Sequence, residues 1–259
     1  MIWKFDNSNT YLLGSVHVLK PGIEYYSKDI DHLYSISDHI VFETDLDNPP
    51  IHLMKYGNGE RLGGNISNNL YTKTKKRWEK YGLSLADLDL SKPWAAATVL
   101  SIKLLEKHGM EWGNGIDKEL FIRTKNDNKV IHTLESQDTA YSCLDNAPPE
   151  EQQEFLSMVI SNPDGILTMY SRILNSWASN NTASLIAILQ DCLKTLPLLY
   201  TGLVIERNGL WTNAILDRIK SGQNNFIVVG ALHCVDTCSI QNNIRNIHGY
   251  TSSNIYETC

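Results

Sequence analysis

Short apolar runs lie near both ends of the chain, and turn residues separate them. Residues 2–5 and 10–16 are apolar segments on either side of the turn-forming residues 6–9, a pattern that predicts a β-hairpin. Four further segments have the length and apolar character of short strands: 39–45, 129–136, 224–230 and 250–256. The run at 224–230 is rich in β-branched residues, as is typical of a strand that is covered on both faces.

Helical periodicity fills most of the chain between these strands. The pattern predicts a connecting helix over residues 25–36, a helical insertion over about residues 50–128 and a second helical tract over about residues 148–221. After a break at 162–165, that tract has apolar residues at the spacing of one buried helix face: Ile166, Met169, Tyr170, Ile173, Leu174 and Trp177. The pattern predicts one α/β domain over residues 1–259, with a mixed central β-sheet flanked by helices and a large helical insertion between the N- and C-terminal strands.

Composition narrows the classes of partner. A net charge of −6 argues against a polyanion, so nucleic acid is not expected as a partner. No apolar stretch is long and uncharged enough to predict a transmembrane segment. The N-terminus lacks the features of a secretory signal, which predicts a cytoplasmic protein if the chain is complete and a secreted or periplasmic one if a signal peptide has been removed. Oligomeric state is left open.

The cysteines do not describe a disulfide framework, because they are five in number and irregularly spaced. We expect reduced thiols. Cys234 and Cys238 follow His233 at a spacing that a soft metal site could use, but a single pair of this kind lacks the second pair found in structural zinc sites.

Two strand ends carry the same pattern, a glycine followed three residues later by a histidine. These are Gly14 to His17 and Gly230 to His233. A glycine permits unusual backbone dihedrals and leaves room for a close approach. Ligands collect at the carboxyl ends of strands in open α/β sheets, so the pattern predicts that both imidazoles face one cleft if their strands are neighbours.

Three charged residues are further candidates for the same site. Glu43 follows a buried strand, where an ionised carboxylate needs a cation, and a metal ion is one candidate. Asp45 is expected on the same strand face, as a further ligand or as a partner that orients a histidine. Arg207 offers fixed donors for an oxyanion, although a salt bridge with Glu206 is an alternative.

The set resembles the TraB/PrgY/GumN family, to which the animal TIKI metalloproteases are related, and more distantly erythromycin esterase and ChaN-type domains. The resemblance is carried by both glycine-histidine motifs, with Glu43 and Arg207 between them, and by short matches in family order: "IWKF", "LLGSVHVL", "KPWAAATVL", "GIDKEL", "HTLESQ" and "ERN". One departure is "CVDTC" after His233, where the family usually continues with apolar residues and glycine.

The resemblance implies a divalent metal ion, of zinc, manganese, cobalt or iron, held by His17, Glu43 and His233. It further implies a hydrolase, with a peptide or small molecule as substrate. With Asp45 added from its position along the strand, the expected catalytic residues are Glu43, Arg207 and Asp45. Asp45, Asp117 or a metal-bound hydroxide remain candidates for the general base, although Asp117 is expected to cap a helix. Two alternatives stay open: a binding protein that sequesters a peptide without turnover, and a metal-independent esterase-like hydrolase.

Overall fold

The protein is built around a six-stranded mixed β-sheet. The structure, a computed structural model, describes residues 1–20, 27–47, 49–57 and 59–256. In spatial order, the strands are β6 (Val130–Thr133), β4 (His39–Phe42), β7 (Asn225–Gly230), β2 (Thr10–Ser15), β1 (Ile2–Phe5) and β8 (Ser252–Asn254).

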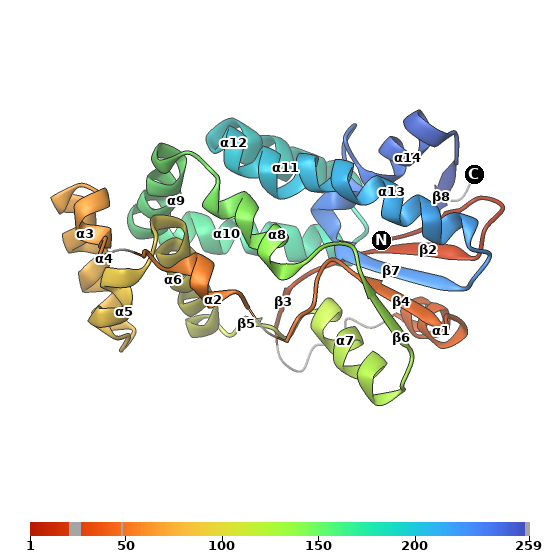
Figure 1. The fold of residues 1–259 in the computed structure, drawn as a ribbon, viewed down its shortest axis with the longest axis horizontal. Helices are drawn as coiled ribbons and strands as arrows, with labels where there is room; N and C mark the ends of the chain where they lie inside the picture. The colour runs from red at the N-terminus through yellow and green to blue at the C-terminus, as the bar shows by residue number, and fades with distance from the viewer. Residues whose placement is uncertain (21–26, 48, 58, 257–259) are drawn as a thin grey trace.

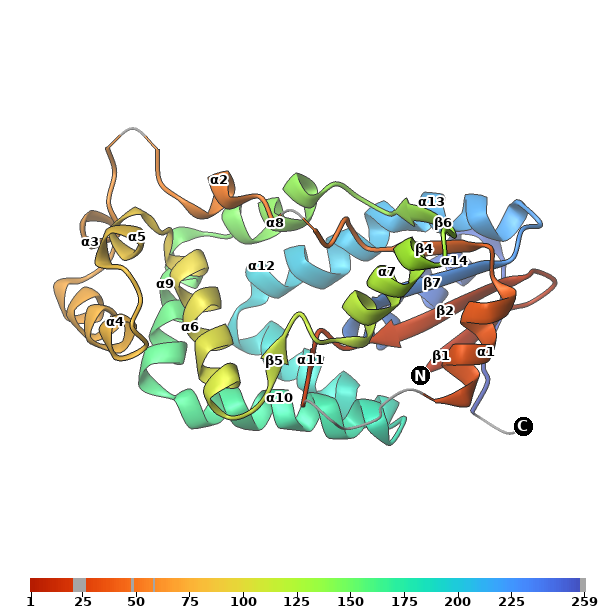
Figure 2. The ribbon, with the colours of Figure 1, turned by 90° about the horizontal axis from the view of Figure 1, so that it is seen from below.

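The four strands from β6 to β2 are mutually parallel, whereas β1 is antiparallel to both β2 and β8. In register, Phe42 lies beside Val228, and Ser15 beside Gly230. The carboxyl ends of four neighbouring strands therefore meet at one edge of the sheet. That edge points toward the helical half of the molecule (Figure 2).

Helices cover both faces of the sheet. Helices α13 (Arg207–Lys220) and α14 (Ile240–His248) lie on one face, and α1 (Lys28–Ile36) and α7 (Ile116–Asn126) on the other (Figure 1). The central strand β7 is covered on both sides, and every one of its residues is buried. This two-sided cover explains why β7 has a continuous apolar sequence rather than an alternating one.

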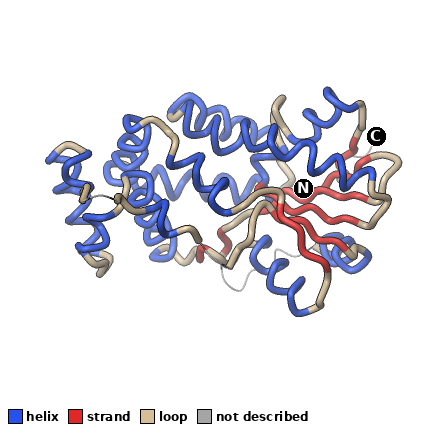
Figure 3. Tube along the Cα trace, in the orientation of Figure 1, coloured by secondary structure: helices blue, strands red, loops and turns tan. Residues whose placement is uncertain are grey.

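A second hydrophobic core lies outside the sheet. The helices that contribute to it are α3 (Leu62–Asn65), α4 (Asn68–Lys80), α5 (Leu85–Leu90), α6 (Pro93–Lys107), α9 (Pro149–Ser161) and the first turns of α10 (Pro163–Ala178). Leu174 and Trp177, farther along α10, belong to the core around the sheet. Helix α10 therefore joins the two cores, and Figure 3 shows the helical half extending away from the strands.

The remaining helices connect these parts. They are α2 (Ile51–Met54), α8 (Gln137–Asp145), α11 (Thr182–Thr195), α12 (Pro197–Tyr200), the π-helix η1 (Thr201–Glu206) and the 3₁₀ helix η2 (Ala231–Cys234). None of the helices in the described residues is both long enough and apolar enough to cross a bilayer.

The α/β class with a mixed sheet and flanking helices is confirmed. The hairpin of β1 and β2 and the buried face of α10 also agree with the sequence pattern. The strand expected at 39–45 is shorter, because it ends at Phe42. Helix α1 begins at Lys28, and residues 25 and 26 of the expected helix lie outside the described residues. The expected insertion also contains β5 (Glu111–Trp112), which pairs with β3 (Val18–Leu19).

Candidate active site

Four of the side chains predicted for the site, those of His17, Glu43, Arg207 and His233, gather at the carboxyl edge of the sheet. Glu43 directly follows β4, His17 lies two residues beyond β2, and His233 lies in η2, which continues from β7. Since β4, β7 and β2 are adjacent, these three side chains come together although His17 and His233 are more than two hundred residues apart in sequence.

Gly230 lies at the centre of this group. A Cβ atom placed there would be 3.3 Å from Glu43 Oε1, 3.3 Å from His17 Nε2 and 3.6 Å from His233 Cδ2. The backbone of Gly230 has φ −57° and ψ 140°, which any residue can adopt. The expected need for unusual dihedrals is therefore wrong for this glycine, and its role is to leave space for three converging side chains.

Gly14 has a different steric role. A Cβ atom there would be 3.2 Å from the Cα atom of Ala231, so the end of β2 packs directly on the backbone of η2. The carbonyl oxygen of Gly14 also accepts a hydrogen bond of 2.6 Å from the indole N–H of Trp177. The first motif glycine therefore joins the two strand ends rather than lining the group of polar side chains.

His17 is oriented by a carboxylate. Its Nδ1 lies 2.7 Å from Asp117 Oδ2, and 42% of the side chain is exposed. Desolvation lowers the pKa of His17, but the adjacent Asp117 carboxylate and the nearby Glu43 outweigh it and raise the pKa to about 9. Without a metal ion, this imidazole is protonated at neutral pH.

Asp117 was expected to cap a helix, and that interpretation is wrong. Helix α7 has Gly115 at its N-cap with no side-chain cap, and Asp117 lies in the first turn with its carboxylate turned toward His17. A Cβ at Gly115 would be 2.3 Å from the carbonyl oxygen of Val16, so glycine is required for α7 to approach the end of β2 this closely. The close approach is what brings Asp117 to His17.

His233 has an opposite environment. Only 7% of its side chain is exposed, and its ring centroid lies 4.6 Å from that of Trp211. Its Nδ1 is 2.7 Å from Asn208 Oδ1, whereas the Asn208 amide nitrogen donates to the carbonyl oxygens of His233 and Cys238. This assigns the proton of the neutral ring to Nδ1 and leaves the lone pair on Nε2, which lies 3.7 Å from Glu43 Oε1. Desolvation is the main reason that the pKa of His233 falls to about 3.

Glu43 is held by two donors. Its Oε1 accepts a hydrogen bond of 2.6 Å from the backbone N–H of Gly230, and its Oε2 lies 2.7 Å from Arg207 Nη2. Desolvation raises its pKa, but Arg207 and the two imidazoles outweigh this and lower the pKa to about 2. Glu43 therefore stays ionised across the physiological range.

Arg207 pairs with two carboxylates, neither of which is the expected alternative partner Glu206. Besides Glu43, it binds Glu135, with Nε donating at 2.8 Å and Nη2 at 2.6 Å from Glu135 Oε1. Its Nη1 donates to the carbonyl oxygen of Leu203, and its guanidinium lies 4.5 Å from the Trp211 ring. All three nitrogens are thus directed at protein groups. The geometry suits a residue that positions Glu43 better than one that contacts a substrate oxyanion.

Glu135 is the acidic residue that the sequence analysis did not assign. It follows β6 at the same edge of the sheet, and its side chain is buried. Burial raises its pKa, and Arg207 opposes that shift. A signal was present, because "HTLES" places an acidic residue just after an apolar strand as "VFETD" does.

The approach of Arg207 depends on η1. This π-helix runs from Thr201 to Glu206, and Arg207 follows it as the first residue of α13. Single π-helical turns occur frequently at functional sites, because the added residue shifts the side chains that follow it. Here the shifted segment places both Arg207 and Asn208 among the strand ends.

Asp45 is not brought into this group. Because β4 ends at Phe42, the period-two expectation that placed Asp45 on the face of Glu43 is wrong. Asp45 is exposed, and its Oδ1 accepts a hydrogen bond of 3.0 Å from the backbone N–H of Asp47. Cys234 is buried near Gly14, and its pKa is raised by burial, so it lacks the thiolate character of a metal ligand.

The donor types at this edge fit a divalent cation, although a closed ligand cage is not formed. Two imidazoles whose Nδ1 atoms are fixed by acceptors, together with one carboxylate, are a common donor set for catalytic metals. Within the described ranges, however, no three His, Cys, Asp or Glu side chains are already arranged to hold a metal ion. Glu43 is instead paired with Arg207.

Comparison with known proteins identifies the family. The sequence model of the TraB/PrgY/gumN family matches residues 1–253, nearly the whole chain. No curated protein and no solved structure matched the chain. The protein belongs to the TraB/PrgY/gumN family.

Proposed function

We propose that this member of the TraB/PrgY/gumN family is a metal-dependent hydrolase that acts on a peptide or a related amide. The observation that supports the proposal best is the convergence of His17 Nε2, Glu43 Oε1 and the His233 ring around the unsubstituted Gly230. Such a gap between two imidazoles and a carboxylate suits an ion rather than a side chain.

The metal ligands would be His17, His233 and Glu43. A divalent ion held there would polarise a substrate carbonyl and lower the pKa of a coordinated water molecule. The chain's own contribution is orientation: Asp117 fixes the ring of His17, and Asn208 fixes the ring of His233 with its Nε2 lone pair toward Glu43.

Arg207 has a supporting role in this proposal. Its contact with Glu43 Oε2 and the Gly230 N–H on Oε1 keep the carboxylate ionised and fixed in direction. Glu135 anchors the guanidinium from the opposite side. Because Glu43 has a pKa of about 2, it is a poor general base near neutral pH. Of the two aspartates considered as general base, Asp117 contacts His17, whereas the Asp45 carboxylate accepts a hydrogen bond from the backbone N–H of Asp47.

A metal-independent hydrolase is the second candidate, and a separate observation favours it. His17 and Asp117 form a pair at 2.7 Å, and the imidazole is partly exposed. An imidazole oriented by a carboxylate is the arrangement that histidine-based hydrolases use for proton transfer. This candidate needs His17 and Asp117 but has no use for the buried Nε2 of His233.

The deciding experiment measures metal content and cleavage of a peptide library for the wild type and for His17→Ala, His233→Ala and Glu43→Gln. His52→Ala is a matched control, because His52 is exposed and its one ion pair within the described residues is with Asp138. We expect all three site variants to lose both metal and cleavage, and His52→Ala to retain both.

Each alternative gives a different result in the same experiment. Cleavage that survives a chelator and His233→Ala, but not His17→Ala, would establish the metal-independent hydrolase. Peptide binding without turnover in the metal-loaded protein would establish the non-catalytic binding protein. Unchanged metal content in all three site variants would reject the proposed ligand set.

A further inference from the structure

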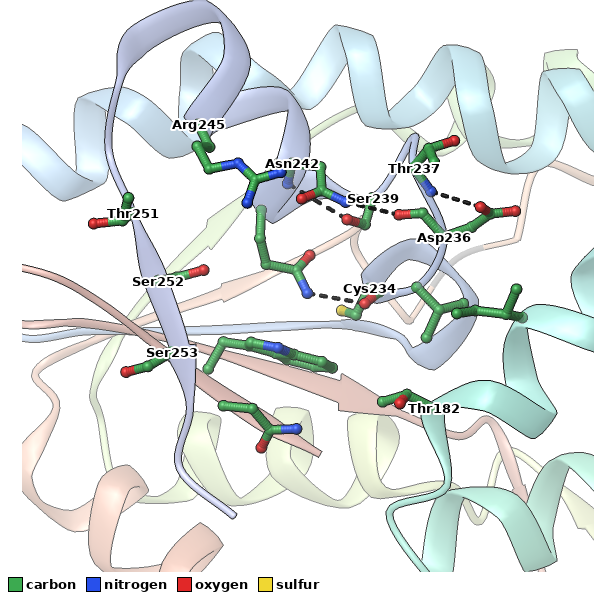
Figure 4. Close-up of a pocket in the computed structure, with 15 residues that line it drawn as sticks. Thr182, Cys234, Asp236, Thr237, Ser239, Asn242, Arg245, Thr251, Ser252 and Ser253 are labelled. Atoms are coloured by element: carbon green, nitrogen blue, oxygen red, sulfur yellow. Dashed lines mark hydrogen bonds between the residues drawn. The ribbon is translucent and has the colours of Figure 1, made fainter. Parts of the chain in front are cut away.

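A separate cavity lies next to the turn that carries His233. Its volume is about 700 Å³, and it is bounded by α14, by β8 and by the loop after η2 (Figure 4). None of His17, Glu43 and His233 lines it. The volume is within the range of roughly 300–1,000 Å³ that is typical of small-molecule sites.

The loop that forms one wall is the segment "CVDTC", where the chain departs from its family's usual pattern. Two amide side chains of α14 hold its backbone: Gln241 Nε2 donates to the carbonyl oxygen of Cys234 at 2.8 Å, and Asn242 Nδ2 to that of Asp236 at 2.9 Å. The wall is therefore shaped by hydrogen bonds before any ligand arrives.

Gln241 has one unsatisfied group. Because Nε2 is committed to Cys234, the other amide atom is fixed as the acceptor Oε1. Gln241 lines the cavity with 9% of its surface exposed, and Oε1 is buried with no hydrogen-bond partner in the described part of the chain. A buried acceptor without a donor is costly, so this position favours a ligand that carries a hydroxyl group.

Arg245 lies one helical turn after Gln241, on the same side of α14. Its side chain extends toward the space between α14 and β8, and the hydroxyl of Ser252 points inward from β8 (Figure 4). Within residues 1–20, 27–47, 49–57 and 59–256, Arg245 forms no ion pair. Ligands with a negative group are therefore favoured here.

Asp236, the other charged residue that lines the cavity, does not oppose the binding of an anion. Asp236 Oδ1 accepts a hydrogen bond of 2.6 Å from the backbone N–H of Thr237, and its carboxylate points away from Arg245 (Figure 4). The first turn of α14 also lines the cavity, with Ser239 at its N-cap, and a helix N-terminus favours negative charge. Cationic ligands find no inward-facing carboxylate on this wall.

We propose that this cavity is a binding site for a small hydroxylated anion, a sugar phosphate or a sugar acid, whose negative group contacts Arg245 and whose hydroxyl groups contact Gln241 and Ser252. The site is distinct from the carboxyl edge of the sheet and does not depend on a metal ion or on hydrolysis.

Isothermal titration of the full chain with a hexose phosphate, a hexuronate, the uncharged hexose and inorganic phosphate tests the proposal. We expect one of the two hydroxylated anions to bind more tightly than both the uncharged sugar and phosphate, and the comparison of the two distinguishes phosphate ester from carboxylate. Arg245→Ala should weaken that binding by about tenfold or more, the loss expected for one charge-assisted contact. Arg61→Ala, at another exposed arginine, should leave it unchanged.

Hydrogen exchange gives an independent readout for the wild type. The ligand that binds should slow exchange in residues 234–254 and not in α4 to α6. The proposal is overturned if neither hydroxylated anion binds, if inorganic phosphate binds as tightly as both, or if a folded Arg245→Ala variant binds as the wild type does.

Discussion

The two glycine-histidine motifs have the same sequence pattern and opposite physical environments. His17 lies partly exposed beside the carboxylate of Asp117, and its pKa is raised to about 9. His233 is buried between Trp211 and the neutral amide of Asn208, and its pKa is lowered to about 3. Without a metal ion, the site at neutral pH therefore holds one charged and one neutral imidazole.

The difference shows that a motif specifies where an imidazole emerges but not its charge. A carboxylate partner stabilises the imidazolium, whereas burial against an amide and an aromatic ring favours the neutral ring. The glycines differ in the same way, since Gly14 packs on a backbone and Gly230 leaves space for side chains. The following predictions test this asymmetry, from the largest expected effect to the smallest.

Arg207→Met should have the largest effect, because it leaves the buried carboxylates of Glu43 and Glu135 facing each other without a cation. Removing one partner of a buried ion pair typically costs about 3–5 kcal/mol. We expect a loss of that size in the free energy of unfolding, measured by urea denaturation at pH 7. Arg207→Lys is the matched control and should lose less, because it keeps the charge without the fork of donors.

Gly14→Ala should affect mainly the stability of the fold, and Gly230→Ala mainly the binding of metal. In Gly14→Ala the new methyl group meets the backbone of Ala231, and overpacking of this kind costs about 1–3 kcal/mol. In Gly230→Ala it meets the side-chain ends of Glu43 and His17 at 3.3 Å rather than backbone, and a side-chain end can shift by a few tenths of an ångström more readily than backbone can. We therefore expect a smaller loss of stability but a loss of metal binding. Urea denaturation and metal analysis of both variants measure this. Equal effects on stability would contradict the distinct steric roles assigned to the two glycines.

The two histidines should make the stability of the metal-free protein depend on pH in opposite ranges, His17 above pH 6.5 and His233 below it. His17 has a folded-state pKa of about 9 against 6.5 when unfolded, so its contribution is complete below pH 6.5 and is lost as pH rises toward 9. His233 has a folded-state pKa of about 3, so the unfolded chain binds the extra proton and stability is lost as pH falls from 6.5 toward 3. Glu43 adds to the acid loss only between about pH 4.5 and 2.

Variants can assign each pH-dependent contribution to its histidine. The free energy of unfolding can be measured by urea denaturation of chelator-treated protein from pH 4.5 to 9. Compared with the wild type, it should fall less above pH 6.5 in His17→Gln and less below pH 6.5 in His233→Gln. If either variant instead changed the pH dependence on the other side of pH 6.5, the assignment of the charged and neutral imidazoles would be reversed.

Asp117→Asn should produce the smallest change, confined to one imidazole. Without the adjacent carboxylate, the pKa of His17 should fall toward its ordinary value, because an amide does not stabilise the imidazolium by charge. The pKa of His233 should change little, since its hydrogen bond to Asn208 is untouched. Titration of the imidazole NMR signals, with metal removed, measures both values in one sample.

Much of the local structure could be predicted from the sequence. Apolar runs bounded by turn residues located β1, β2, β4, β6 and β7, and the three- and four-residue spacing located the buried face of α10. The ends of these elements were less certain, and the error that placed Asp45 in the site came from a strand that ends earlier than its apolar pattern. Apolar periodicity reports burial, whereas a strand ends where its backbone stops pairing with a neighbouring strand.

The residues that complete the site were not predicted in their roles, for a physical reason. Asp117 lies 100 residues from His17 in sequence, and Glu135 lies 72 residues from Arg207. The first turn of a helix and a polar strand end are the local settings of these residues, and nothing nearby in sequence identifies their partners. Gly115 was a partial signal, because its absence of a side chain permits the approach of α7.

The sequence by itself determined the element types, the family and the identity of the two imidazoles, the carboxylate and the guanidinium at the strand ends. The element types follow from local hydrophobic spacing. The family and the site residues follow from which residue types stand at which positions of the chain. Only the tertiary structure decided that His17 is paired and His233 buried, that Arg207 bridges two carboxylates, and that Gly230 leaves the space between them. Charge state and contact depend on distance and solvent exposure, and the chain acquires both only when it folds.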